Sequence, residues 1–301
     1  MITDFHGKCA VLTGAGSGFG LECARIAARL GMSVVLVDVQ ADALEQADAE
    51  LRTTGADVLS RRTDVASAAD MEALARAVQD RFGAPHFVFN NAGVGAGGLV
   101  WENSVADWEW VLGVNLWGVI HGVRLFTPMM LAAAKGDASW QGHIVNTASM
   151  AGLLAPPNMG VYNTGKHAVV GLTETLYQDL RLVTTQVGAS VLCPHFVPTA
   201  ITRSERNRPS ALAALPRTRS QMIGEAMGEQ AVRSGRVSAA DVAQMVFDAV
   251  AQDRFYIYSH PKGMGAVRAR VEAIVHGTNP ADPFGERPEL GEQLRAALRD
   301  G

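Results

Sequence analysis

The chain has 301 residues with a formal net charge of −4, and 48% of its residues are hydrophobic and 19% charged. This length suffices for one large domain or two small ones, with a full core that needs no disulfides. The charge balance excludes the basic surface of a nucleic-acid-binding protein. With no apolar run of about 20 residues, no transmembrane helix is expected. Three scattered cysteines without CxxC spacing, and a start without a long apolar segment, predict a cytoplasmic protein without signal peptide, disulfide or metal site.

Short apolar runs alternate with amphipathic stretches through most of the chain. Continuous apolar or β-branched runs predict strands covered on both faces, and apolar residues at helical spacing predict the helices between them. We expect strands at 8–13, 33–38, 57–64, 86–90, 143–148 and around 190–193, and helices at 19–30, 41–52, 69–82, within 105–127 and at 161–183. This alternation predicts an α/β fold, a doubly wound parallel sheet of about seven strands flanked by helices, in a single domain.

The alternation stops after Pro194. Residues 195–220 have no clear period and are too long for an ordinary connection, which predicts a lid or a disordered insert, within a substrate-binding region at 195–235. Helices are expected at 221–233, 239–251 and 265–276, with a last strand at 254–258 and a C-terminal extension at 260–301 that ends in a Pro/Gly-rich tail. Five arginines of this region are interpreted as a solvated surface or, alternatively, as ligands of an anionic substrate group: Arg203, Arg206, Arg208, Arg217 and Arg219.

Four alternate glycines follow the first strand in TGAGSGFG, residues 13–20. The pattern TGxxxGxG fits at Thr13, Gly14, Gly18 and Gly20, whereas GxGxxG does not fit. Such glycines permit a tight turn and a close approach of the backbone to a pyrophosphate, to which the next helix offers its N–H groups. The alternative is a turn without a ligand. No Lys-Ser/Thr pair follows, which excludes a Walker A loop.

Acidic and amide side chains end the next strands. Asp38 lies 18 residues after Gly20, close to the spacing of the acid that binds the ribose 2′-hydroxyl of a dinucleotide. A carboxylate there repels a 2′-phosphate, and no arginine is adjacent in sequence, so NAD is expected rather than NADP; the alternative role of Asp38 is a helix cap or turn. Asp64-Val65 and Asn90–Gly93 end later strands at the same carboxyl edge, where ligands bind in open α/β sheets.

Ser149, Tyr162 and Lys166 form a second pattern. Ser149 follows the fifth strand, and Tyr162 and Lys166 are four residues apart, on one face of the expected helix. A nearby ammonium favours the phenolate and lowers the pKa of tyrosine from about 10, which suits a general acid/base near neutral pH. Alone, a Tyr-x-x-x-Lys pair also occurs by chance on helix surfaces.

In this order and spacing, the motifs resemble the short-chain dehydrogenase/reductase family over about residues 5–200, and its longer members beyond that. The resemblance implies a Rossmann-type fold and a dehydrogenase that passes hydride between nicotinamide and a carbinol carbon. It implies that Tyr162 moves the proton, Lys166 lowers its pKa and binds the ribose, Ser149 orients the carbonyl oxygen, and Asn115 holds a water in a relay. The implied cofactor contacts are Gly14, Ser17, Gly18, Phe19, Gly20, Asp38, Val39, Asp64, Val65, Asn91, Ala92, Gly93, Tyr162, Lys166, Pro194, Val197 and Thr199.

One position departs from the family pattern, because Pro194 is followed by His195 instead of glycine. His195 is expected either to pack in its loop or to shape the substrate pocket and proton transfer. The substrate is expected to be a bulky, mostly apolar secondary alcohol or ketone. The expected substrate contacts are Trp101, Met150, Leu154, Pro156, His195 and Phe196.

The expected assembly is a homodimer or homotetramer through the helices in 105–127 and 161–183, without nucleic-acid or membrane partners. Two alternatives remain: an NADP-linked carbonyl reductase, and a non-catalytic dinucleotide-binding sensor or scaffold. The complete set of Asn115, Ser149, Tyr162 and Lys166 favours an enzyme, since a binding module has no need of it.

Overall fold

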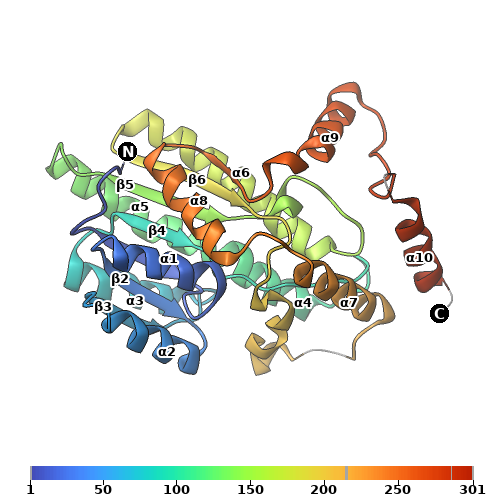
Figure 1. The fold of residues 1–301 in the computed structure, drawn as a ribbon, viewed down its shortest axis with the longest axis horizontal. Coiled ribbons are helices and arrows are strands. Elements are labelled where there is room, and N and C mark those ends of the chain that lie inside the picture. The colour runs from blue at the N-terminus through green and yellow to red at the C-terminus, as the bar shows by residue number, and fades with distance from the viewer. Residues whose placement is uncertain (1, 214–215, 286, 300–301) are drawn as a thin grey trace.

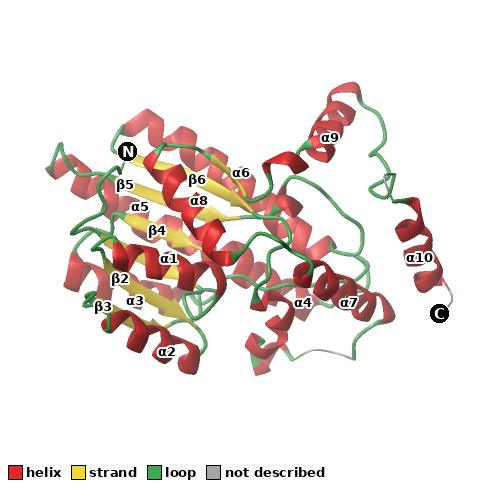
Figure 2. Ribbon diagram, in the orientation of Figure 1, coloured by secondary structure: helices red, strands yellow, loops and turns green. Residues whose placement is uncertain are grey.

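A seven-stranded parallel sheet forms the centre of the computed structural model, which describes residues 2–213, 216–285 and 287–299 (Figures 1 and 2). The strand order is β3-β2-β1-β4-β5-β6-β7, and every neighbouring pair is parallel. The α/β, doubly wound fold expected from the alternating pattern is therefore confirmed. The strands are β1 (Cys9–Thr13), β2 (Ser33–Asp38), β3 (Val58–Arg62), β4 (Phe87–Asn90), β5 (Gly142–Thr147), β6 (Val187–Cys193) and β7 (Tyr256–Tyr258).

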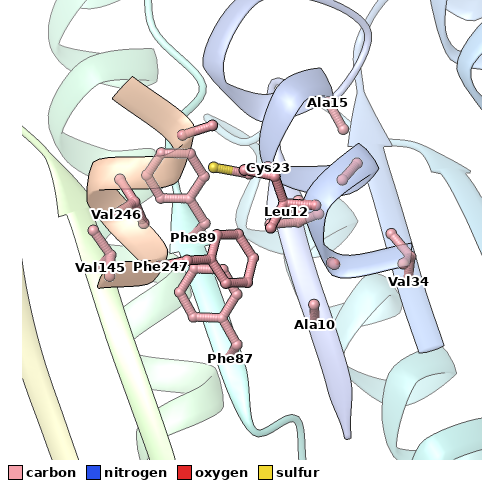
Figure 3. Packing of buried hydrophobic residues seen from close by; sticks show 14 of the residues in the cluster. Ala10, Leu12, Ala15, Cys23, Val34, Phe87, Phe89, Val145, Val246 and Phe247 are labelled. Atoms are coloured by element: carbon pink, nitrogen blue, oxygen red, sulfur yellow. The ribbon is translucent and has the colours of Figure 1, made fainter. Parts of the chain in front are cut away.

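Two layers of helices cover the sheet (Figure 1). On one face lie α1 (Gly18–Arg29), α2 (Ala41–Arg52) and α8 (Ala239–Ala251), and on the other α3 (Ala68–Phe82), α5 (Gly118–Gly136) and α6 (Gly160–Val183). In the first layer, Phe247 of α8 packs on Phe87 of β4 with ring centroids 5.2 Å apart (Figure 3). Such aromatic pairs stabilise a core by about 0.5–1.5 kcal/mol beyond the area they bury.

The sheet reverses its winding between β1 and β4. The chain runs outward from β1 through β2 to β3 and then returns to place β4 on the other side of β1. In sheets of this kind the ligand crevice lies at the carboxyl ends of the strands at this point. The Thr13 hydroxyl accepts hydrogen bonds from the backbone N–H groups of Asn91 (2.8 Å) and Ala92 (3.0 Å), so the loop after β4 is fixed beside the glycine turn.

The long helix expected within 105–127 is divided and extends further. It consists of α4 (Val105–Leu112), a π-helical segment η1 (Gly113–Trp117) and α5, which continues to Gly136 through Pro128. By length and composition alone, Val105–Gly136 is apolar enough to cross a membrane. Of this apolar segment 33% is buried, and its buried side chains, including Phe126 and Met130, pack against the sheet.

Regular structure beyond Pro194 is more extensive than expected. Within the aperiodic part of the lid region, residues 200–207 and 210–212 form 3₁₀ turns, and a helix occupies residues 288–299 of the tail, where none was expected. The helix at 265–276 is confirmed at both ends, and α9 and α10 extend away from the sheet (Figure 1). The elements outside the sheet layers are η2 (Met150–Gly152), η3 (Ala200–Asn207), η4 (Ser210–Leu212), α7 (Arg219–Arg233), η5 (Pro261–Gly263), α9 (Gly265–His276) and α10 (Pro288–Arg299).

Large apolar side chains are exposed on the helices where subunit contacts were expected. Trp117, at the junction with α5, is 52% exposed, and Leu182 and Val183 at the end of α6 are 83% and 68% exposed. Homo-oligomer formation stays a prediction, as does the division of the chain into one domain with a lid and an extension.

A buried histidine makes stability depend on pH. His143 of β5 is fully buried, its Nε2 lies 2.7 Å from the Ser190 hydroxyl, and burial lowers its pKa from 6.5 to about 3. Below pH 6.5 the unfolded chain binds a proton that the folded chain excludes, so His143 destabilises the fold progressively as the pH falls from about 6.5 towards 3. The slope is about 1.4 kcal/mol per pH unit for one proton.

We expect His143→Gln to reduce this acid sensitivity, because the amide can still bond Ser190 but does not titrate. Urea unfolding at several pH values between 6.5 and 4.5 measures the slope of unfolding free energy against pH. The exposed His276, changed to glutamine, is the matched control and is expected to leave the slope unchanged. Equal slopes for wild type and His143→Gln would contradict the assignment.

Candidate active site

The glycine turn between β1 and α1 has no room for side chains at its crossing point. Gly14 and Gly18 have φ values of +67° and +55°, in the left-handed region that glycine adopts without strain. A Cβ on Gly20 would lie 2.2 Å from the Gly14 carbonyl oxygen, and one on Gly14 would lie 3.0 Å from Ala92 Cα. The turn brings bare backbone and the N-terminus of α1 to the crevice, which fits the pyrophosphate of a dinucleotide.

Asp38 lies directly beside this turn. Its two carboxylate oxygens accept the backbone N–H groups of Gly16 and Gln40, each at 2.9 Å. A Cβ on Gly16 would lie 2.9 Å from the carboxylate. The acid is thus held at the carboxyl end of β2, next to the turn, where an acidic residue can accept hydrogen bonds from an adenosine ribose.

Two arginines, distant in sequence, reach the residues next to Asp38. Arg62 lies opposite Asp38 in the backbone register of the parallel strands β2 and β3. Its side-chain Nε donates a hydrogen bond to the Val39 carbonyl oxygen at 3.0 Å. Arg206 of η3 donates from Nε to the Gln40 side-chain oxygen at 3.1 Å. The absence of an adjacent arginine in sequence therefore did not mean that none lies near Asp38 in space.

The fold brings Ser149, Tyr162 and Lys166 together. Tyr162 and Lys166 are 9% and 3% exposed, and Lys166 Nζ lies 5.7 Å from the centre of the Tyr162 ring. Lys166 Nζ also donates to the Thr147 carbonyl oxygen at 2.9 Å, which fixes the ammonium at the end of β5. The Ser149 side chain interacts with the phenol of Tyr162. A hydroxyl, a phenol and an ammonium thus converge at the carboxyl edge of the sheet.

Burial changes the acidities expected for this group. It raises the pKa of Tyr162 to about 12, against the opposing effect of a hydrogen bond with Ser149. This direction is opposite to the one expected from the Tyr-x-x-x-Lys spacing, because burial removes water from the phenol and disfavours its charged form. Burial also lowers the pKa of Lys166 to about 8. At neutral pH the phenol therefore carries its proton and is a donor towards a carbonyl oxygen.

Asn115 holds the loop that follows β4. It is fully buried in the π-helical segment, where its Oδ1 accepts the Val94 N–H at 2.8 Å and its Nδ2 donates to the Val94 carbonyl at 2.9 Å. A Cβ on Gly93 would lie 3.3 Å from Asn115 Oδ1 and 3.8 Å from Lys166 Nζ. The side chain of Asn115 thus positions the loop beside Lys166, and its role in a water relay stays a prediction.

The remaining expected cofactor contacts surround the same edge. Thr199 lies against Gly18, since a Cβ on that glycine would be 3.4 Å from Thr199 Cγ2. The Pro194 carbonyl accepts the Met150 N–H at 2.9 Å, which joins the end of β6 to the segment after Ser149. The others lie on the turns that follow the strands: Ser17 and Phe19 at the start of α1, Asp64 and Val65 after β3, Asn91 and Ala92 after β4, and Val197 after β6.

The expected substrate contacts differ in their surroundings. Met150 is 6% exposed and packs in the core, whereas Trp101 is 76% and Phe196 39% exposed. Leu154 and Pro156 are half-buried in the segment after Ser149.

His195 is one of a pair of histidines. Its ring lies 4.7 Å from Phe196 and 5.5 Å from His260, a residue that sequence analysis did not single out. Burial, and then the charge of His260, lower the pKa of His195. A neutral imidazole at the end of β6 is therefore favoured, and what it contacts in a substrate stays a prediction.

The lid region contacts the loop after β4. The Gly95 N–H donates to the Ser204 hydroxyl at 2.9 Å. Arg208, whose side chain is 7% exposed, pairs with Asp107 at 2.6 Å and lies 4.8 Å over the Trp110 ring. The expectation of a solvated arginine surface is therefore wrong for Arg208, which the partners from α4 bury. Sequence analysis missed these contacts, because the partners are about 100 residues apart and carry no local motif.

A doubly wound sheet with a glycine turn, an acid at the end of β2, and a buried Tyr-Lys pair beside Ser149 is typical of dinucleotide-dependent oxidoreductases. The sequence pattern of the short chain dehydrogenases matches residues 8–210, and the chain belongs to this family. It is 31% identical over 276 residues to a CLA biosynthesis dehydrogenase/reductase of Lactiplantibacillus plantarum, covering 90% of this chain and 94% of the relative. It is 37% identical over 175 residues to a cyclohexanol dehydrogenase of Acinetobacter sp., covering 58% and 67%.

A solved structure is more similar still. It is a short chain dehydrogenase/reductase from Burkholderia phymatum in complex with NAD, with 53% sequence identity and a TM-score of 0.90. The match covers 94% of this chain and 99% of that one. The Rossmann-like fold and the oxidoreductase family are thus shown over nearly the whole length.

Proposed function

We propose that this oxidoreductase uses NAD to interconvert a secondary alcohol and a ketone on a mostly apolar molecule. The observation that carries the proposal is the convergence of Ser149, Tyr162 and Lys166 beside the loop after β4, at the edge that also holds the glycine turn and Asp38. A non-catalytic binding module has no need of a buried phenol and ammonium at this place.

The residues at this edge have separate tasks. When bound, the nicotinamide accepts or supplies the hydride. The Ser149 hydroxyl orients the substrate oxygen, and the protonated Tyr162 phenol donates a proton to it or, in the reverse direction, receives one. Lys166 stabilises the phenolate that remains, because its ammonium lies 5.7 Å from the ring.

Two observations support NAD as the cofactor. Asp38 places a carboxylate beside the glycine turn, where it accepts ribose hydroxyls and repels a 2′-phosphate. The similar protein from Burkholderia phymatum was solved with NAD. A specific observation favours the alternative cofactor NADP, since Arg62 and Arg206 both reach the residues next to Asp38.

The apolar substrate is supported by the side chains near the site. Leu154 and Pro156 are half-buried in the segment after Ser149, Phe196 is 39% exposed after β6, and Trp101 is exposed on the loop after β4. One relative is a cyclohexanol dehydrogenase, and cyclohexanol is a cyclic secondary alcohol.

The test is the change in reduced-nicotinamide absorbance with ethanol, 2-propanol, cyclohexanol and 1-phenylethanol, each with NAD and with NADP. We expect kcat/KM at least tenfold higher with NAD, which corresponds to about 1.4 kcal/mol, and the highest rates with the cyclic or aryl alcohols. Asp38→Ala is expected to narrow the cofactor difference, and Arg206→Gln to reduce only activity with NADP. Equal activity with NADP, or ethanol as the best substrate, would contradict the proposal.

A further inference from the structure

We propose that Asn158 is a positioning residue that joins the start of the catalytic helix α6 to the lid helix α7. Its side-chain Nδ2 donates to the Ser220 carbonyl oxygen at 2.9 Å, between residues 62 positions apart. Asn158 is 8% and Ser220 2% exposed, so water does not replace this bond. For its kinetic readout the inference rests on the proposed function.

The backbone of Asn158 is left-handed. Its φ is +63°, a region that non-glycine residues seldom adopt and that asparagine tolerates better than most. In this conformation its carbonyl oxygen accepts the Gly98 N–H at 2.9 Å, while Met159 forms a parallel bridge with Gly98. Asn158 therefore turns the chain into α6 and, at the same residue, binds the loop after β4.

The first turn of α6 carries Tyr162 and is confined by the same loop. A Cβ on Gly160 would lie 2.5 Å from Val100 Cγ2, and the Asn163 N–H already bonds the Met159 carbonyl at 2.8 Å. Asn158 lies directly before the N-cap residue Met159. The backbone conformation of Asn158 therefore sets the position of the first turn of α6, and with it the position of the Tyr162 side chain.

Ser220 is the second half of the contact. Its hydroxyl accepts the Leu99 N–H at 2.9 Å and donates to the Glu102 carboxylate at 2.7 Å, and both of these residues lie in the loop after β4. The buried Asn158–Ser220 bond and the two bonds of the Ser220 hydroxyl make this set a rigid node, in which the Asn158 Oδ1 atom has no hydrogen-bond partner among the described residues. We call Asn158, Ser220, Leu99 and Glu102 the latch, which links three segments around the site: the start of α6, the loop after β4 and α7.

The latch is expected to change the apparent KM for the substrate, which a hydrogen bond that only stabilises the fold would not change. If α7 closes over bound substrate only when the latch is made, the apparent KM is inversely proportional to the fraction of closed molecules. Breaking the Asn158–Ser220 bond removes a buried hydrogen bond between α7 and the start of α6 and favours the open form. The expected result is a higher KM with little change in kcat, because Tyr162, Ser149 and Lys166 are untouched.

Three substitutions separate the side chain from the backbone. Asn158→Gly keeps the left-handed backbone and removes the side-chain amide. Asn158→Asp keeps the size and shape of the side chain but replaces the N–H donor by a carboxylate oxygen, which repels the Ser220 carbonyl oxygen. We expect both to raise KM about tenfold with kcat within threefold of wild type, measured with NAD and whichever of cyclohexanol and 1-phenylethanol wild type oxidises faster. Asn158→Ala, which strains the turn as well, is expected to lower kcat and the melting temperature in addition.

Trypsin supplies a readout that needs no activity. Arg219 directly precedes Ser220 and Arg217 lies three residues before it, so we expect Asn158→Gly and Asn158→Asp to be cut there about tenfold faster than wild type, as the open population grows. Ser190→Ala is the control, because Ser190 lies in β6 and its hydroxyl bonds His143 and the Arg254 carbonyl oxygen. Loss of these buried bonds is expected to lower the stability of the fold without changing KM or the rate of cleavage by trypsin.

Unchanged KM and cleavage in Asn158→Gly and Asn158→Asp would overturn the latch, and so would an equal rise in KM for Ser190→Ala. If wild type oxidises no alcohol of the panel, the proposed function fails while the trypsin comparison still decides the latch.

Discussion

Tyr162→Phe is expected to lower kcat by at least 100-fold while the dissociation constant for NAD changes by less than about threefold. Loss of a positioned general acid/base costs about 10²–10⁴ in rate. The ring of Tyr162 is buried, and phenylalanine fills the same space without the hydroxyl that is proposed to exchange a proton with the substrate oxygen. The glycine turn after β1 and Asp38 at the end of β2, the proposed cofactor site, are not altered.

Steady-state rates and NAD titration by calorimetry measure these two quantities separately. Tyr177→Phe is a matched control on the same helix, because that hydroxyl only accepts a bond from Arg181 at 2.7 Å on the surface. It is expected to keep wild-type kcat. Retention of more than a tenth of the turnover by Tyr162→Phe would remove Tyr162 from the proposed chemistry.

Gly20→Ala is expected to weaken NAD binding at least 100-fold and to lower the melting temperature. The new Cβ would lie 2.2 Å from the Gly14 carbonyl oxygen, and since both groups are backbone or fixed to it, the turn must open. Opening displaces the N–H groups that face a pyrophosphate. Each charge-assisted hydrogen bond of that kind contributes about 1.5–3 kcal/mol, so loss of two accounts for the expected effect.

The control for this variant is Gly171→Ala in α6. A Cβ on Gly171 meets nothing within 4 Å, so the change is expected to stabilise the helix by up to about 1 kcal/mol and to leave NAD affinity unchanged. Calorimetric titration and thermal unfolding of both variants make the comparison. NAD binding by Gly20→Ala within threefold of wild type would show that the turn does not form the cofactor site.

The elements that the sequence predicted correctly are those marked by residues within the element itself, such as a capping box or a regular apolar period. The helices at 239–251 and 265–276 begin and end where the sequence places them, and Ser238 starts the first with a capping box to Asp241. The π-helical segment Gly113–Trp117 was not predicted, because in a run of apolar residues its longer period is not distinguishable from the ordinary helical one. The helix Pro288–Arg299 was missed because proline and glycine precede it.

The same distinction applies to the site. Tyr162 and Lys166 were predicted, since their four-residue spacing puts them on one helical face. The pKa of Tyr162 was predicted in the wrong direction, because burial depends on segments far away in sequence. The latch and the Asp107–Arg208 ion pair were not predicted, because both join segments that are far apart in sequence. For the latch, the sequence near Asn158 shows only an asparagine after two prolines, a pattern that favours a turn.

The pairing of Arg208 with Asp107 limits how the substrate range of this protein can change. Asp107 both caps α4 and receives the guanidinium, and the two side chains are 13% and 7% exposed. Removing one partner of such a buried pair costs about 3–5 kcal/mol, because the other charge stays without compensation. Exchanging residues 195–235 for a segment without an arginine at position 208 is therefore expected to leave the Asp107 carboxylate without its partner. We therefore expect that engineering of this region succeeds only when residues 195–235 and the 95–107 loop are exchanged together.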